Sequence, residues 1–332
     1  MAYLQNSSVI RKRQQPASLL AGARSVIVFG QHYQLSNSES NGCREYGVIA
    51  SYALYPDYHH VLKQKARELI AHIESQVGHQ IGSKFFVDSS QLMEKDYAYL
   101  AGTGWIGRNS LLIVPPYGSN CMIGCIMTDL ELADDQVKLH QDLCLDCRKC
   151  IDACPTHCIQ ENRTIDARKC IAYLTIEYKG IIPRSLRVMM GNRLFGCDQC
   201  QIVCPLNKQL DEFNDSSISR DDLIFNGEND FSDALSLTRE TYDQKFKMTP
   251  IIRASYDMFM RNVLIAIGNS RLSQFADDLK DLLEKSDSTL IRSHAAWALG
   301  MIDPMETRSY FQNLMKSEAD ENVKQEIAWY IH

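Results

Sequence analysis

The stretch CLDCRKCIDACP, residues 144–155, decides how this chain is organised, because it places four cysteines and a proline within twelve positions. The chain has 332 residues, which is enough to bury a hydrophobic core without cross-links. Its twelve cysteines are therefore not needed as disulfide staples. We expect a reducing compartment, where clustered thiols bind metal more often than they pair with each other.

The spacing of these cysteines is that of a bacterial ferredoxin. Cys144, Cys147, Cys150 and Cys154, with Pro155 directly after the last, follow the pattern C-x2-C-x2-C-x3-C-P. A [4Fe-4S] cluster takes one thiolate per iron, and in two-cluster ferredoxins the cysteine before the proline ligates the other cluster. A second cysteine motif is therefore required.

The second motif is GCDQCQIVCPLNK, residues 196–208, which is one thiol short of a full copy. Cys170 is the best candidate for the missing ligand. Exchanging the fourth ligands predicts one cluster on Cys144, Cys147, Cys150 and Cys204, and another on Cys154, Cys170, Cys197 and Cys200. A pair of zinc sites is the alternative, but zinc favours two C-x2-C pairs separated by a longer loop.

The remaining cysteines are Cys43, Cys121, Cys125 and Cys158, and we expect them to be small buried thiols. Two clusters in one region form a path for electrons, and such a path needs two ends. We expect a soluble donor such as flavodoxin or ferredoxin at one end. The other end is a redox centre or a substrate held by the N-terminal domain.

Hydrophobic patterns predict an α/β (α+β) domain at the N-terminus. Residues 23–33, 83–90 and 110–118 are apolar runs typical of strands, and residues 57–78 have the spacing of an amphipathic helix that ends at Gly78. The expected domains are an N-terminal catalytic domain (1–135), a ferredoxin-like two-cluster domain (136–210), an acidic linker (211–234) and a HEAT-like helical domain (235–332).

The C-terminal part is helical and weakly repetitive. Ala266, Ala298 and Ala328 recur every 30 to 32 residues inside apolar helical patterns. This period suggests stacked helix pairs of the HEAT kind, and an ordinary all-α bundle is the alternative.

Charge and hydropathy limit the partners. The formal net charge is -6, which argues against a protein coated in basic surface for duplex DNA, but residues 163–193 carry a local charge of +5. The N-terminus lacks the apolar core of a signal peptide, and no run of eighteen apolar residues is present. We therefore expect a cytoplasmic monomer with no membrane contact.

The N-terminal domain offers two candidate features. The segment AGTGWIGRNSLLI, residues 101–113, has three glycines that would let a flat ligand approach the backbone, although turn glycines are the simpler explanation. Asp88 follows a strand-like run and is either a general acid or a turn cap. No nucleotide-binding glycine motif is present.

The order of the motifs resembles that of one enzyme family over nearly the whole chain. The motifs are KRQQPASLLAGARSVI, DYHHVL, FVDSSQL, GTGWIGRNS, RKCIAYLT, GNRLFGCDQCQ and HAAWALG. This sequence resembles the epoxyqueuosine reductases, which use cobalamin and iron–sulfur clusters to make queuosine in tRNA.

The resemblance implies that base-off cobalamin, fed by two [4Fe-4S] clusters, reduces an epoxide at the wobble nucleoside to an alkene with loss of water. It implies that Arg13 lies near the cofactor and that Asp88 is the proton-donating acid. It implies that residues 1–135 form a cobalamin-binding catalytic domain, with further cofactor contacts from Asp88, Gly104, Trp105, Asn109 and Tyr173. The implied partner is the tRNA anticodon stem-loop, and the basic segment makes Lys179 and Arg184 candidate tRNA contacts.

Two other functions fit the cysteine motifs. A cobalamin-dependent reductive dehalogenase-like enzyme would also join cobalamin to two cubane clusters, but it would not need the helical tail. An iron–sulfur electron-carrier subunit would have no chemistry of its own, and bound corrinoid would exclude it.

Overall fold

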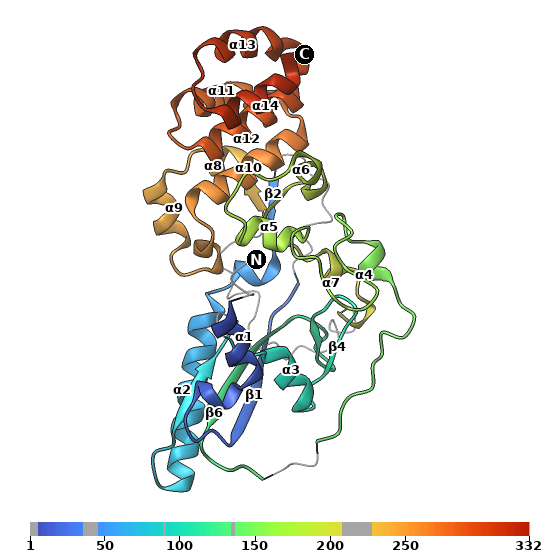
Figure 1. Cartoon of the computed structure of the whole chain (residues 1–332), viewed down its shortest axis with the longest axis vertical. Helices are drawn as coiled ribbons and strands as arrows, with labels where there is room; N and C mark the ends of the chain where they lie inside the picture. Colours follow the sequence, from blue (N-terminus) through green and yellow to red (C-terminus); the bar gives the residue numbers. More distant parts are fainter. Residues whose placement is uncertain (1–5, 36–45, 89–90, 134–136, 208–227, 332) are drawn as a thin grey trace. The chain divides into compact units, whose positions relative to one another are not determined.

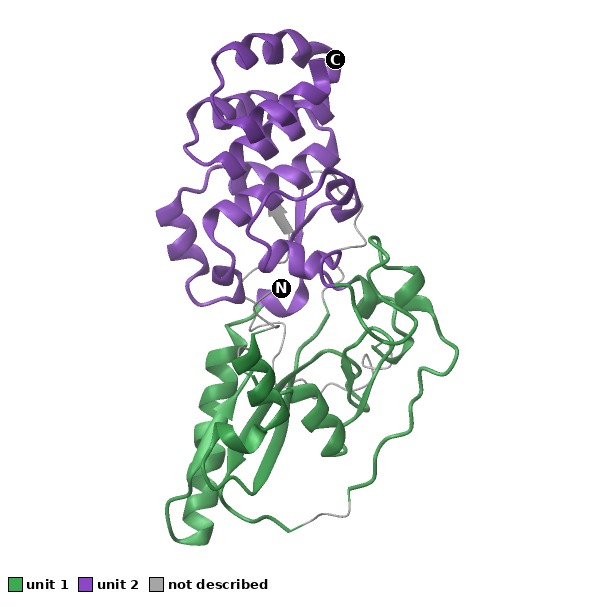
Figure 2. Ribbon diagram, in the orientation of Figure 1, with its two compact units in different colours: residues 1–35, 55–166, 199–223 green, residues 36–54, 167–198, 224–332 purple. Residues whose placement is uncertain are grey.

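The computed structural model describes residues 6–35, 46–88, 91–133, 137–207 and 228–331. The chain divides into two compact units, each built from separate stretches of sequence (Figure 2). Unit 1 comprises residues 1–35, 55–166 and 199–223, and unit 2 comprises residues 36–54, 167–198 and 224–332. These units do not coincide with the expected consecutive domains, because both the N-terminal and the cysteine-rich regions contribute to both units. The domain bounds stay a prediction.

Unit 1 contains a three-stranded antiparallel sheet with strand order β1-β6-β3 (Figure 1). The strands are β1 (Ser25–His32), β3 (Ser83–Phe86) and β6 (Cys121–Thr128), and helix α2 (Tyr58–Val77) packs against β3 and β6. The side chain of Asp57 caps the start of α2, and Gly78 ends it in the left-handed conformation with φ 76°. The strands expected within residues 23–33 and 83–90 and the helix expected at residues 57–78 are confirmed.

The sheet positions the other elements of unit 1. A small core of Phe86, Leu92, Cys125 and Met127 lies on it, so Cys125 is the buried thiol that we expected. The apolar run 110–118 forms only a two-residue strand. The other elements are α1 (Ser7–Gln14), η2 (Pro16–Leu19), α3 (Glu94–Leu100), β4 (Trp105–Ile106), β5 (Leu112–Ile113), α4 (Lys149–Asp152) and α7 (Gln199–Ile202).

Unit 2 contains a second sheet with strand order β7-β2-β8. Strand β2 (Tyr46–Ile49) pairs parallel with β7 (Arg193–Phe195) and antiparallel with β8 (Glu228–Asp230). Strand β8 and most of helix α8 (Phe231–Leu235) lie in the segment 211–234 that we expected to be a linker, and the side chain of Phe231 is fully buried. Residues 228–234 are therefore folded into unit 2, and the rest of the expected linker lies outside the described residues.

Stacked helices form the C-terminal part of unit 2 (Figure 1). Helix α12 (Thr289–Ile302) packs against α10 (Tyr256–Ser270), α11 (Ala276–Lys285), α13 (Pro304–Ser317) and α14 (Glu321–Ile331). A Cβ on Gly268 would lie 2.9 Å from the Cα of Ala298, so glycine lets α10 and α12 approach closely. A helical C-terminal region is thus confirmed, whereas its HEAT character stays a prediction.

The remaining elements of unit 2 are helical. They are η4 (Ser51–Leu54), α5 (Ile171–Ile176), α6 (Arg184–Met190), α9 (Arg239–Phe246), η7 (Pro250–Arg253) and η8 (Ser273–Phe275). Among the described residues, no helix combines the length and the apolar character needed to cross a membrane.

Two buried polar side chains on α10 bind the helices to residues 167–198. Arg261 donates to the carbonyl oxygens of Leu174 at 2.6 Å and Gly180 at 3.0 Å, and burial lowers its pKa to about 10. Asn262 donates to the carbonyls of Thr175 and Leu194 at 3.0 and 2.8 Å. Removing the helices would leave these buried carbonyls without donors, so the helical region is not an independent domain.

A fully buried histidine makes a third connection. The Nδ1 of His294 on α12 donates to the Leu290 carbonyl at 2.7 Å, and its Nε2 accepts from the Ile182 amide at 3.3 Å. These two bonds require the neutral ring. Burial, together with the positive charge of Arg187, holds the pKa of His294 well below the ordinary 6.5.

This histidine makes stability depend on pH. Below pH 6.5 the unfolded chain protonates His294 and the folded chain does not, so the free energy of unfolding falls by about 1 kcal/mol per pH unit. We expect the melting temperature of the wild type to fall more steeply between pH 7 and 5 than that of His294→Gln, measured anaerobically by circular dichroism. The exposed His72→Gln is the matched control and should follow the wild type. Equal slopes for His294→Gln and the wild type would contradict this account.

Candidate metal centre and active site

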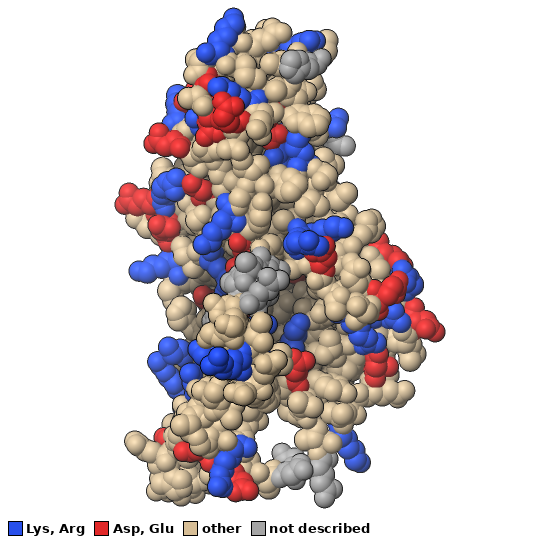
Figure 3. All heavy atoms as spheres, viewed as in Figure 1, with Lys and Arg blue, Asp and Glu red and all other residues tan. Residues whose placement is uncertain are grey.

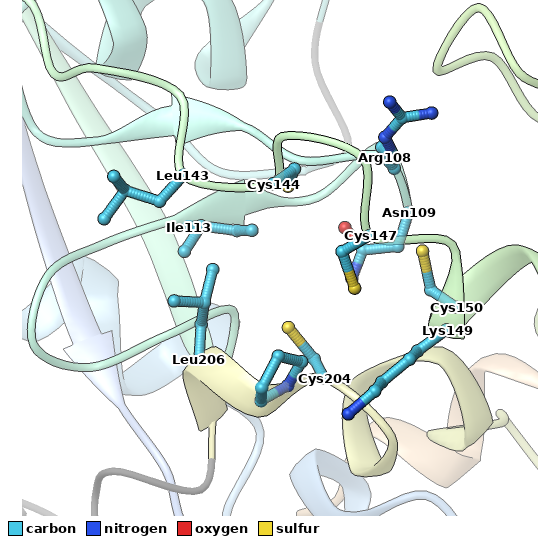
Figure 4. Close-up of a pocket in the computed structure, with 11 residues that line it drawn as sticks. Arg108, Asn109, Ile113, Leu143, Cys144, Cys147, Lys149, Cys150, Cys204 and Leu206 are labelled. Atoms are coloured by element: carbon cyan, nitrogen blue, oxygen red, sulfur yellow. The ribbon is translucent and has the colours of Figure 1, made fainter.

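Four cysteines from both motifs surround one cavity in unit 1 (Figure 4). Cys144 and Cys147 lie on a loop, Cys150 lies in α4, and Cys204 follows α7. Helices α4 and α7 pack against each other, which brings the two motifs together. This set of thiols is the one expected for the first cluster.

The thiols influence one another electrostatically. Burial raises the pKa of Cys150, and negative charge on Cys204 and Cys144 raises it further. Burial likewise raises the pKa of Cys204, with a contribution from Cys144 and Cys147. Iron must therefore displace protons from these thiols when it binds.

The arrangement suits a cluster better than a single ion. Among the described residues, no three His, Cys, Asp or Glu side chains converge closely enough to hold one metal ion. A cubane needs one thiolate at each of its four irons, so its ligands are distributed around a cavity. No disulfide is formed by the cysteines of the described ranges.

Hydrogen bonds hold the cysteine loop in shape. The Cys147 amide donates to the Cys144 carbonyl at 2.8 Å, and Leu145 between them has φ 43°. The guanidinium of Arg108, on the turn between β4 and β5, donates to the Leu145 carbonyl at 2.6 Å. Asp142 accepts from the Cys144 amide at 2.8 Å and pairs with Arg163. These contacts connect the loop that carries Cys144 and Cys147 to the rest of unit 1.

A second network positions Cys204. The side chain of Asn207 accepts from the Ser119 amide at 2.7 Å and donates to the Gln201 carbonyl at 2.8 Å. The Ser119 hydroxyl donates to the Gln201 side chain at 3.1 Å. All three side chains are buried, so α7 and the residues after it are bound to the segment that precedes β6.

The cysteines expected to bind the second cluster belong to both units. Cys154 in unit 1 is buried with its Sγ 3.4 Å from that of Cys158, and a hydrogen bond from Cys158 lowers the pKa of Cys154 to about 4. Cys200 belongs to unit 1, whereas Cys170 and Cys197 belong to unit 2. Their grouping as ligands of one cluster stays a prediction. The sequence analysis missed the contact between Cys154 and Cys158.

Asp88 lies at the end of a chain of polar contacts. The Tyr58 hydroxyl donates to Asp88 Oδ2 at 2.8 Å, and His59 Nε2 lies 3.9 Å from the same oxygen. The other ring nitrogen of His59 lies 2.8 Å from Asp57 Oδ1. The side chain of Asp88 is 52% exposed, so it faces solvent rather than the core.

The start of α2 builds this group. Asp57 caps the helix by accepting from the His59 amide at 2.9 Å and also contacts the His59 ring. Burial alone would raise the pKa of Asp57, but the bonds from His59 outweigh burial and lower it. Asp88 has φ 47°, a strained conformation that is common at functional sites. The motif DYHHVL belongs to the family resemblance, but the sequence indicated no role for Tyr58 or His59.

Three of the expected cofactor residues carry buried hydrogen-bond donors with no partner in the described part of the chain. They are Nε of Arg13 on α1, Nε1 of Trp105 on β4 and Nδ2 of Asn109. The donors of Arg13 and Trp105 fit a large polar cofactor, because a buried donor without an acceptor is costly. Asn109 instead lines the cavity of the four thiols.

The other expected cofactor residues are Asp88, described above, Gly104 and Tyr173. A Cβ on Gly104 would lie 2.0 Å from the Ile113 carbonyl oxygen, so this glycine serves the close approach of β4 and β5. Tyr173 lies in unit 2, on α5, with its ring centre 6.5 Å from that of Tyr178.

The basic segment, residues 163–193, has fewer side chains available for contact with RNA than its charge suggests. Arg184 pairs with Glu326 and stacks 4.9 Å from the ring centre of Trp329, and the buried Arg187 lies 2.5 Å from Glu326. Lys179 is exposed. Figure 3 shows Lys and Arg scattered among Asp and Glu on the face in view. Arg184 therefore has a structural role, and Lys179 is the better candidate for an RNA contact.

Comparison with known proteins supports one family. The family described as epoxyqueuosine reductase QueG, DUF1730, matches residues 13–89, and the 4Fe-4S double cluster binding domain matches residues 143–207. An epoxyqueuosine reductase of Francisella cf. novicida is 37% identical over 302 residues, covering 87% of this chain and 82% of that protein. One from Bacillus anthracis is 31% identical, covering 96% and 83%.

Solved structures are also similar. A crystal structure of epoxyqueuosine reductase with an epoxyqueuosine-modified tRNA-Tyr stem loop has a TM-score of 0.88 and 30% identity, covering 97% of this chain and 85% of that one. Epoxyqueuosine reductase from Streptococcus thermophilus has a TM-score of 0.84 and 27% identity, covering 99% and 91%.

The cysteine arrangement predicts which cluster each thiol supports. Iron analysis and EPR should show that Cys204→Ala loses one cluster and keeps the other, because it removes a ligand from the cavity in Figure 4. Cys170→Ala should lose the other cluster. The buried Cys125→Ala is the matched control and should keep both clusters. Retention of both clusters in Cys204→Ala would refute the assignment.

Proposed function

Because the chain belongs to the epoxyqueuosine reductase family, we propose that it reduces the epoxide of epoxyqueuosine in tRNA to the alkene of queuosine with cobalamin and two [4Fe-4S] clusters. It is an oxidoreductase with a double-cluster domain. The observation that carries the proposal is the presence, in unit 1, of both the four-thiol cavity and the Asp57–His59–Asp88 group.

The reaction consumes two electrons and two protons, and the epoxide oxygen leaves as water. Each [4Fe-4S] cluster carries one electron at a time, so two transfers complete one turnover. Cobalamin, when bound, supplies electrons to an epoxide carbon. The buried donors of Arg13 and Trp105 would hold it, since both lack acceptors among the described residues.

Asp88 is the proposed general acid. Its exposed carboxyl group can reach a substrate in solvent, and it gives one of the two protons to the epoxide oxygen as the first carbon–oxygen bond breaks. The second proton, taken up as the resulting hydroxyl group leaves as water, comes from the solvent that reaches this exposed site. The carboxylate that remains is stabilised by the Tyr58 hydroxyl, which donates to Oδ2 at 2.8 Å.

His59 is the proposed group that returns the proton. Asp57 Oδ1 contacts one ring nitrogen and orients the ring, while Nε2 faces Asp88. The distance of 3.9 Å is longer than a hydrogen bond, so the proton passes after a small movement or through one water. This arrangement restores Asp88 between turnovers without placing His59 on the substrate.

The proposed substrate is the wobble nucleoside of an anticodon stem-loop. Single-stranded loops are where proteins can expose a base for chemistry, and exposed lysines bind the flanking phosphates. Lys179 is the candidate contact in unit 2. The proposed electron donor to the clusters is a soluble flavodoxin or ferredoxin. The proposed place of cobalamin is the N-terminal part of the chain.

Replacing Asp88 tests the acid. Asp88→Asn keeps the side-chain shape but cannot give a proton to the leaving oxygen, so the single-turnover rate should fall by roughly 100- to 10,000-fold. Iron content and the cobalamin absorbance spectrum should stay as in the wild type. A rate near that of the wild type, measured as queuosine formed in modified tRNA, would make Asp88 a turn residue only.

Replacing His59 tests the proton return. His59→Gln should slow steady-state turnover roughly tenfold or more, whereas the first turnover, which uses the proton already on Asp88, should be little changed. The adjacent exposed His60→Gln is the matched control and should behave as the wild type in both measurements. An equal loss in the first turnover of His59→Gln would show that His59 acts on the substrate or on folding instead.

A further inference from the structure

One buried amide at the cluster cavity has a donor with no acceptor. Asn109 is only 2% exposed, and its Nδ2 has no hydrogen-bond partner among the residues that the structure describes. Asn109 lines the same cavity as Cys144, Cys147, Cys150 and Cys204. A buried N–H group of this kind is expected to face an acceptor in the working protein.

The orientation of the amide is fixed by its own turn. Asn109 Oδ1 accepts from the Leu111 amide at 3.2 Å, so the oxygen is engaged and the nitrogen is the group left for the cavity. A Cβ on Gly107 would lie 2.9 Å from that oxygen, so glycine leaves room for this orientation. Figure 4 shows the Asn109 side chain extending toward that of Cys147.

The turn is bound to the cysteine loop on two sides. Arg108, next to Asn109, donates to the carbonyl of Leu145, which lies between two of the cysteines. Arg163 donates to the Ile106 carbonyl at 2.5 Å and pairs with Asp142 just before the loop. Asn109 is thus held in place relative to the thiols by the protein itself.

We propose that Asn109 Nδ2 donates an N–H···S hydrogen bond to the first cluster, at a cluster sulfide or a ligating thiolate, and raises its reduction potential. The proposal rests on the cluster assignment of the proposed function. Reduction adds negative charge to the cluster, and a donor stabilises the more negative state. The donor therefore favours the reduced state of the first cluster.

Redox titration of the anaerobic protein, followed by EPR, tests the proposal. Asn109→Leu has a similar volume but no donor, so one of the two midpoint potentials should fall while the other stays unchanged. A tenfold fall in the equilibrium constant for reducing that cluster corresponds to about 59 mV for a one-electron couple. The exposed Asn162→Leu is the matched control and should move neither potential. Unchanged potentials in Asn109→Leu with full iron content would overturn the proposal.

If Asn109→Leu loses iron, a second measurement on the wild-type protein tests the proposed hydrogen bond. Wild-type protein labelled with 15N in the asparagine side chains should show a 15N coupling at one reduced cluster in pulsed EPR. Absence of this coupling would overturn the proposal. Neither measurement uses tRNA, so a negative result here leaves the proposed reductase activity standing, and loss of that activity would not change these spectra.

Discussion

The structure of unit 1 depends on one long-range constraint, which is that Cys204 shares a cavity with Cys144, Cys147 and Cys150. Cys144, Cys147 and Cys150 lie close together in sequence, on a loop and the helix α4 that follows it. Cys204 can reach them only because α7 packs against α4. The buried network of Ser119, Gln201 and Asn207 holds α7 in that place. Because residues 167–198 belong to unit 2, the chain must leave unit 1 between the two motifs and return to it. Metal binding and the fold are therefore interdependent.

The same unit holds the groups that we propose to supply protons to the reaction. The capping residue Asp57 begins α2 and also holds the His59 ring, and this places His59 and Tyr58 near Asp88 at the end of β3. Proton chemistry thus depends on a helix terminus and a strand end rather than on burial. Asn109 connects the turn between β4 and β5 to the cluster cavity. In this account the chain itself supplies both proton transfer and control of electron transfer.

Some features could be predicted from the sequence because they depend on local spacing. The cysteine intervals identified the ligands that share the cavity, and Asp57 and Gly78 marked the ends of α2. Other features depend on pairs far apart in sequence. Strand β2 pairs with β7 and β8, which no local pattern indicates, so the boundaries of the units were missed. Arg184 was counted as free charge because its partner Glu326 lies 142 residues later. His59 was missed because its role depends on Asp88, which lies on another element.

The central claim is that this chain uses cobalamin and clusters to remove the epoxide oxygen from a tRNA nucleoside. The most direct measurement is nucleoside mass spectrometry of epoxyqueuosine-containing tRNA after incubation with the anaerobically purified, cobalamin-loaded protein and a chemical reductant. The account predicts that epoxyqueuosine disappears and that a product lighter by one oxygen atom, queuosine, appears in equal amount. Unchanged epoxyqueuosine, with the clusters shown to be reduced and tRNA bound, would contradict it.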